Sequence, residues 1–184
     1  REVTGVDYVS AGDLIEATQD TGSFVHISGM LKSVAIKISK ICNDLRLLSS
    51  GPRAGFNEIN LPPMQPGSSI MPGKVNPVIP EVVNQVAFEV IGADMTISMA
   101  SEGGQLQLNV FEPLIAYKLF TSINMMRRAF YSLGEKCIKG ITANEDVCME
   151  NILNSVTLVT CLNPIIGYEK CSSLAKEALR TNKR

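Results

Sequence analysis

Residues 24–48 read FVHISGMLKSVAIKISKICNDLRLL and repeat an apolar side chain at alternating steps of three and four positions. These positions are Phe24, Ile27, Leu31, Val34, Ile38, Ile41, Leu45 and Leu48. The spacing places them along one side of an α-helix, like the seam of a coiled coil. Capping by Asp13 and the helix-ending pair Gly51-Pro52 bound a helix of about 35 residues, roughly 50 Å long. Because a small compact domain cannot cover so long a helix, this stretch predicts a helical bundle.

Two more long helices follow. One begins at Asn76-Pro77, where asparagine can cap and proline suits the first turn, and Gly103-Gly104 interrupts it. Its apolar positions are Ile79, Val82, Val83, Val86, Val90, Ala93 and Ile97. The next helix enters near Pro113 and continues to about Gly140. Three such helices and almost no strand pattern predict an all-α, long-helix bundle, whose wide apolar stripes require further helices or subunits for full burial.

The chain changes character twice. Residues 51–73 are rich in glycine, proline, asparagine and serine, which predicts a long irregular loop, and such loops are usually functional or disordered. Beyond Gly140 the predicted helices shorten, to residues 144–159 and 168–179. We therefore expect part of a central helical-bundle domain over residues 1–140 and the start of a small helical C-terminal domain over residues 141–184.

The composition is globular, with 45% hydrophobic and 19% charged residues among 184. A net charge of −1 without a long basic run argues against nucleic acid as a partner. No uncharged stretch reaches the ~20 residues of a membrane span. The five cysteines form no Cys-x-x-Cys pair and His26 is the one histidine, so we expect free thiols, a cytoplasmic location and no metal site. Because the chain begins at Arg1 rather than methionine, we expect a piece of a longer protein.

The residues with the clearest chemistry are 67–76, which read GSSIMPGKVN. Taken alone, the serines are ordinary turn residues and Lys74 is a surface charge. Three features favour a binding site instead. Two glycines let the backbone approach a ligand, the loop leads into a helix N-terminus that attracts anions, and Lys74 and Asn76 can converge on one carboxylate. Ser68 is then a candidate proton-transfer group, provided that a positive field stabilises its alkoxide.

Residues 67–77, GSSIMPGKVNP, resemble the signature of the fumarase/aspartase superfamily, Gly-Ser-Ser-x-Met-Pro-x-Lys-x-Asn, at every fixed position. The resemblance extends to KICNDLRLLSSGPRAGFNEINLP before the loop and to NPVIPEVVNQVAFEVIG, EGGQLQLNVFEP and CIKGITANEDVC after it. Residues 78–81 are similar to the aspartase (aspartate ammonia-lyase) branch, whereas fumarases resemble Thr-Gln-Cys-Glu there. The chain thus resembles the middle and later part of an aspartase-branch subunit more than twice as long.

The resemblance implies reversible anti-elimination of ammonia from L-aspartate to give fumarate, without an organic cofactor. Ser68 matches the family's catalytic base, which removes the proton from the carbon next to the side-chain carboxylate and leaves a doubly charged aci-carboxylate. Lys74 and Asn76 match positions that bind this carboxylate, and Asn76 can also cap the helix. Most of the rate should come from stabilising the developing charge.

Four residues are assigned supporting roles. Glu81 matches a family glutamate that pairs with an active-site histidine, although a carboxylate near a helix start also interacts favourably with the helix dipole. Ser69, Gly67 and Gly73 complete the loop, and the glycines allow it to close as a lid. His26 does not match the family's histidine, which belongs to a motif upstream of this chain, so we expect a packing or helix-surface residue.

Members of this family form homotetramers in which three subunits meet at each active site, and the long seams fit a shared bundle. Because segments that bind the rest of the substrate lie upstream, we expect the isolated chain to be inactive. Three alternatives remain: fumarate hydratase, a structural relative like those recruited to the lens, and a helical interaction module whose loop is a coincidence. The complete set of Ser68, Lys74 and Asn76 argues against lost catalysis.

Overall fold

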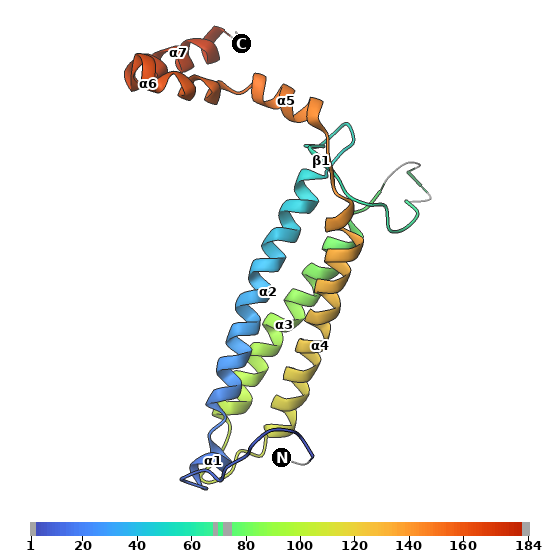
Figure 1. Ribbon diagram of the computed structural model, residues 1–184, viewed down its shortest axis with the longest axis vertical. Coiled ribbons are helices and arrows are strands. Elements are labelled where there is room, and N and C mark those ends of the chain that lie inside the picture. The colour runs from blue at the N-terminus through green and yellow to red at the C-terminus, as the bar shows by residue number, and fades with distance from the viewer. Residues whose placement is uncertain (1–2, 68–69, 72–74, 182–184) are drawn as a thin grey trace. The chain divides into compact units, whose positions relative to one another are not determined.

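The computed structural model describes residues 3–67, 70–71 and 75–181. Its three long helices are α2 (Gly22–Leu48), α3 (Val78–Glu102) and α4 (Glu112–Lys136), which lie side by side in Figure 1. The shorter elements are α1 (Glu16–Gln19), β1 (Ile59–Asn60), η1 (Ile138–Gly140), β2 (Thr142–Ala143), α5 (Glu145–Leu153), η2 (Val156–Leu162), α6 (Asn163–Ile166) and α7 (Tyr168–Thr181). The two strands pair antiparallel, with Ile59 opposite Ala143. The predicted all-α class is therefore confirmed.

The chain folds into two compact units. One comprises Arg1–Arg46 and Pro62–Gly140, and the other comprises Leu47–Leu61 and Ile141–Arg184. Residues 47–61 thus belong with the C-terminal residues. The division expected from the sequence, 1–140 and 141–184, cuts the chain once at residue 140. It therefore assigns residues 47–61 to the first domain instead of the second unit.

The prediction of one helix from Asp13 onward is wrong, because the chain forms α1 and then α2. Asp13 caps α1 through its Oδ1, which accepts the N–H groups of Ile15 (2.9 Å) and Glu16 (3.0 Å). Asp20 ends α1 in an extended conformation, and its Oδ1 accepts the N–H of Gly22 at 3.0 Å. Aspartate side chains compete with helical hydrogen bonding in this way, so the helix breaks at Asp20.

The remaining helices differ from the predictions mainly at their ends. α3 stops before Gly103 and α4 begins at Glu112, as predicted, whereas α3 starts two residues later than Asn76. The single helix predicted over residues 144–159 is wrong: α5 is followed by the 3₁₀ helix η2. The break lies at Ser155, whose Oγ accepts the N–H of Thr157 at 3.2 Å.

Helix α2 packs against its neighbours through small side chains. Its buried residues are Ser28, Ala35, Ser39 and Cys42. Ala35 belongs to a core cluster with Ala87 and Val90 of α3 and Met126 of α4. A second cluster joins α3 to α4 through Ile97, Ala100, Ile115 and Leu119. The fully buried residues of α2 are therefore all small.

The predicted seam of α2 is only partly packed: Leu31 and Ile38 are half-buried against the core, whereas other seam residues are exposed. Phe24, Ile27, Val34 and Ile41 are 40–46% exposed. Large apolar side chains at least 40% exposed continue over the three helices, namely Met30, Ile36, Val82, Phe88, Met95, Met99, Leu114, Tyr117, Phe120, Ile123, Phe130 and Tyr131. This agrees with the prediction that three helices cannot bury their own stripes. Within the described residues, no helix is both long and apolar enough to span a bilayer.

An ion pair joins the N-terminal half of α2 to α3. The Asp94 carboxylate, 8% exposed, accepts hydrogen bonds from Ser28 Oγ (2.7 Å) and Lys32 Nζ (2.5 Å). Burial raises the pKa of the Asp94 carboxyl, but the hydrogen bonds from Lys32 and Ser28 outweigh it, so the pKa lies below its ordinary value. A lowered pKa means that folding favours the ionised carboxylate. The stabilisation is therefore complete above the unfolded-state pKa of about 3.9 and is lost as the pH falls through the folded-state pKa.

Replacing Asp94 with asparagine should lower the free energy of unfolding by about 2 kcal/mol at pH 7, because it removes one partner of a buried pair. The loss stays moderate because Lys32, 42% exposed, can reach water. Chemical denaturation measures this, and the difference from wild type should shrink below about pH 4. The matched control is Asp44→Asn, which breaks an exposed ion pair between Asp44 and Lys40, both on α2. It should lower the free energy of unfolding by less than about 0.5 kcal/mol. Equal losses in the two variants would contradict the prediction.

Candidate active-site loop

The predicted site, residues 67–76, ends two residues before α3. Its described members are Gly67, Ile70, Met71, Val75 and Asn76. Asn76 is half-buried and the other four are exposed. The predicted base Ser68, its neighbour Ser69, Gly73 and the carboxylate-binding Lys74 lie outside the described residues. The structure therefore describes the two ends of the loop and the helix that follows it.

The N-terminus of α3 offers fewer amide donors than an average helix start. Pro77 occupies the N-cap position and Pro80 lies in the first turn, and proline has no N–H group. The N–H of Val78 donates to the Asn76 carbonyl at 2.9 Å, and that of Glu81 to the Pro77 carbonyl at 3.1 Å. The helix dipole remains. Donors to a bound carboxylate must consequently come more from side chains than the sequence argument assumed.

Glu81 is half-buried in the first turn of α3, five positions after Asn76. A carboxylate there interacts favourably with the helix dipole, which is the simpler of its two predicted roles. His26 is exposed on α2, which agrees with the helix-surface position expected for it. The pairing role of Glu81 stays a prediction.

The first turns of α3 are held on α2 by Asn84, which is 2% exposed. Its Nδ2 donates to the Ser39 carbonyl (3.0 Å), to Ser39 Oγ (2.8 Å) and to Asn43 Oδ1 (3.1 Å). Its Oδ1 accepts a hydrogen bond from Arg46 Nη1 at 3.3 Å. Sequence reasoning missed this residue. Asn84 could have been recognised in the sequence as a polar residue at a position where the apolar stripe of α3 is expected to continue.

The segment that precedes the loop is held by Asn144. The Asn144 Nδ2 donates to the Asn57 carbonyl at 2.8 Å, and the Asn144 N–H donates to the Glu58 carbonyl at 2.9 Å. Asn60 Nδ2 donates to Asn144 Oδ1 at 2.6 Å. The Glu58 carboxylate accepts a hydrogen bond from Asn151 Nδ2 at 3.2 Å. Glu58 and Asn60 therefore serve local structure, whereas Asn144 was missed because its partners lie 84 to 87 positions away.

Thiol chemistry is disfavoured at the inner cysteines. Burial raises the pKa of the Cys42 thiol to about 11, and the neighbouring Cys137 adds to the shift. Burial also raises the pKa of Cys137. Both remain protonated at neutral pH, which makes them poor nucleophiles and poor metal ligands. Among the residues that the structure describes, no group of three or more His, Cys, Asp or Glu side chains gathers as a metal site would require.

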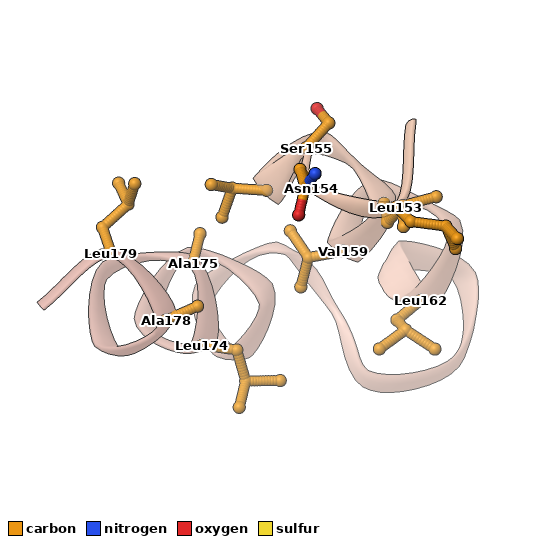
Figure 2. A pocket seen from close by; sticks show the side chains of 11 residues that line it. Leu153, Asn154, Ser155, Val159, Leu162, Leu174, Ala175, Ala178 and Leu179 are labelled. Atoms are coloured by element: carbon orange, nitrogen blue, oxygen red, sulfur yellow. The ribbon is translucent and has the colours of Figure 1, made fainter. Parts of the chain in front are cut away.

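A pocket of about 800 Å³ lies in the C-terminal unit between η2 and α7 (Figure 2). Its lining is Leu153, Asn154, Ser155, Val156, Leu158, Val159, Leu162, Leu174, Ala175, Ala178 and Leu179. Figure 2 shows mainly leucine, valine and alanine side chains around it. Because no lining residue is charged, the pocket has nothing to balance the charges of a small dicarboxylate. The loop remains the better candidate for such a ligand.

A family model described as Lyase matches residues 1–92, which are 92 of the 184 residues. The chain belongs to this lyase family. A second model, described as Fumarase C C-terminus, matches residues 158–184. The superfamily that the loop sequence resembles is thereby confirmed.

This lyase chain is similar to aspartate ammonia-lyase from Helicobacter pylori, at 66% identity over 183 residues. The match covers 100% of the chain but 39% of that protein. A solved structure named fumarate lyase:delta crystallin, from Brucella melitensis, is 53% identical with a TM-score of 0.92, over 99% of this chain and 40% of the other. A class II fumarase from Schistosoma mansoni is 36% identical with a TM-score of 0.90, over 96% and 37%. The lyase chain therefore spans about two-fifths of the relatives it matches.

Proposed function

We propose that the full-length subunit containing this chain is an aspartate ammonia-lyase, which eliminates ammonia from L-aspartate to give fumarate. The observation that carries the proposal is the 66% identity to an enzyme of that name over 100% of the chain. The loop sequence of residues 67–76 also supports it, because the predicted base Ser68 and the predicted carboxylate ligands Lys74 and Asn76 are all present.

The proposed reaction proceeds in two steps. Ser68 Oγ, acting as an alkoxide, takes a proton from the carbon next to the side-chain carboxylate, and the electron pair of the broken C–H bond moves onto that carboxylate. The resulting aci-carboxylate carries two negative charges. It then collapses: the C–N bond to the protonated amino group breaks, the nitrogen keeps the bonding pair and leaves as ammonia, and the new C=C bond completes fumarate. No oxidant or reductant is needed, because the electron pair that forms the double bond displaces the amine.

The proposed role of Lys74 and Asn76 is to bind the carboxylate where the second charge appears. The ammonium of Lys74 and the amide of Asn76 can supply the donors that the proline-containing first turn of α3 lacks. Loss of one such donor typically costs about 3 kcal/mol of transition-state stabilisation. Asn76 is half-buried beside the helix start, which suits a side chain that holds one position.

We also propose a homotetramer with active sites shared between subunits. Its support is the series of large apolar side chains exposed along α2, α3 and α4, which further helices or subunits can cover. The chain spans about two-fifths of its relatives, so residues outside it can supply the other substrate contacts. A cytoplasmic location is proposed as well, and the five cysteines, all free thiols, support a reducing compartment.

The proposal is tested by following fumarate absorbance when the full-length subunit is supplied with L-aspartate or with L-malate. Fumarate from aspartate and none from malate is the expected result. Fumarate from malate and none from aspartate would establish the alternative, fumarate hydratase. The similarity to a class II fumarase is the reason to include this substrate. No turnover of either substrate by the assembled protein would favour a structural relative, a possibility raised by the name delta crystallin on a similar structure.

A further inference from the structure

The buried polar side chains of α3 are distributed unevenly along the helix. Asn84 and Asp94 lie on its packed face, and Asn109 follows its C-terminal end. Asn84 is six positions after the first residue of the helix and eight after Asn76. It is therefore the described buried polar side chain that lies nearest in sequence to the predicted carboxylate site.

The contacts of Asn84 specify one alignment of α3 on α2. The neighbouring buried residues Pro80, Val83 and Ala87 contribute apolar packing, which tolerates small sliding and rotation. Hydrogen bonds do not tolerate such movements, because a shift of α3 along α2 by one residue leaves a buried donor or acceptor without a partner. Nδ2 of Asn84 bonds two atoms of Ser39 within 3.0 Å, and its Oδ1 accepts from Arg46. Single polar residues in helical interfaces act in this way to fix register.

The alignment matters for the proposed chemistry because the loop ends on this helix. Glu81 lies in the same helix as Asn84, less than one turn away, and Asn76 precedes the first residue of that helix by two positions. Any axial slide or rotation of the start of α3 would carry Asn76 with it. A misplacement of about 1 Å at a catalytic group can cost about 100-fold in rate.

We infer that Asn84 is a positioning residue for catalysis: its hydrogen bonds to α2 set the register of the start of α3 and hence the place of Asn76 in the carboxylate site. The inference rests on the proposed function. It assigns Asn84 no contact with substrate. Its effect reaches the reaction through the backbone of the first turns of α3.

The test compares Asn84→Ala with Asn109→Ala in the full-length subunit. Asn109 is a matched control, because it is also an asparagine that is 2% exposed, and it holds the opposite end of the same helix. Its Nδ2 donates to the carbonyls of Ala100 (3.0 Å) and Ser101 (3.2 Å), and its Oδ1 accepts from the N–H of Phe111 (2.8 Å). Both variants should lower the unfolding midpoint by similar amounts.

The expected difference lies in kinetics. Asn84→Ala should lower kcat/KM for L-aspartate about 10- to 100-fold, mainly through kcat, whereas Asn109→Ala should stay within about 1.5-fold of wild type. A second readout uses an aspartate analogue with a nitro group in place of the side-chain carboxylate, whose nitronate form mimics the aci-carboxylate. Its affinity for Asn84→Ala should fall in step with kcat/KM, as expected when transition-state binding is impaired.

Equal activity losses in the two variants would overturn the inference and leave Asn84 a purely structural residue. If Asn84→Ala does not fold, Ser39→Ala removes one hydroxyl partner only and should give a smaller loss of about 3-fold in kcat. Unchanged kcat in that variant would equally overturn the inference. An inactive wild-type protein would instead refute the proposed function, so the two failures are distinguishable.

Discussion

Replacing Ser68 with alanine in the full-length subunit should lower turnover of L-aspartate by at least about 1,000-fold, because removing the proton acceptor removes the first chemical step. The proposed tetramer should remain intact, since the substitution deletes a single oxygen atom. Fumarate absorbance measures the rate, and size-exclusion chromatography measures the assembly. In the same variant, exchange of the C3 proton of aspartate with solvent deuterium should also be lost.

The control for Ser68 is its neighbour. Ser69→Ala makes the same change one position away and, as a supporting residue, should reduce turnover much less. A Ser68→Ala subunit that keeps its activity, or one that still exchanges the C3 proton, would remove Ser68 from the role of base. An equal loss in both variants would indicate that turnover depends on the loop as a whole and not on proton removal by Ser68 in particular.

The isolated 184-residue chain should produce no measurable fumarate from L-aspartate. The chain spans 39% of its H. pylori relative, and the proposed site needs substrate contacts from upstream segments and other subunits. It also leaves a wide apolar surface uncovered on α2, α3 and α4. The measurement is an absorbance assay on purified chain, with helical content followed by circular dichroism.

Traces of a host enzyme could imitate activity in that assay. The matched control is the same chain carrying Ser68→Ala, purified identically, because a contaminant would be equally active in both samples. Fumarate formed by the chain and abolished by Ser68→Ala would contradict the prediction. It would mean that these residues alone assemble a working site.

Sequence reasoning predicted the three long helices because apolar periodicity persists over 25 or more residues in each. It was wrong at Asp20, where one side chain caps the backbone and outweighs the periodicity. It also assigned the interior of α2 to the large apolar residues. Leu31 and Ile38 do pack against the core, but the fully buried residues of α2 are the small side chains Ser28, Ala35, Ser39 and Cys42.

The candidate loop was predictable because its residue types combine at short spacing, from Ser68 to Asn76. Its supports were not. Asn84 reaches a partner 45 positions away, and Asn144 reaches one 87 positions away, so neither shows a local pattern. The scarcity of amide donors at the start of α3 became clear only when Pro77 and Pro80 were placed at its first turn.

Because residues 47–61 belong to the C-terminal unit, that unit is encoded by two separate parts of the gene, which limits how related genes can recombine. A crossover at Gly140 between two family members would inherit Asn57 and Asn60 from one parent and Asn144 from the other. The hybrid unit would then depend on both parents keeping compatible residues at those positions. A boundary between units is therefore a poor crossover site in this chain. Segments that are separate in the sequence, such as residues 47–61 and 141–184, form one folded unit.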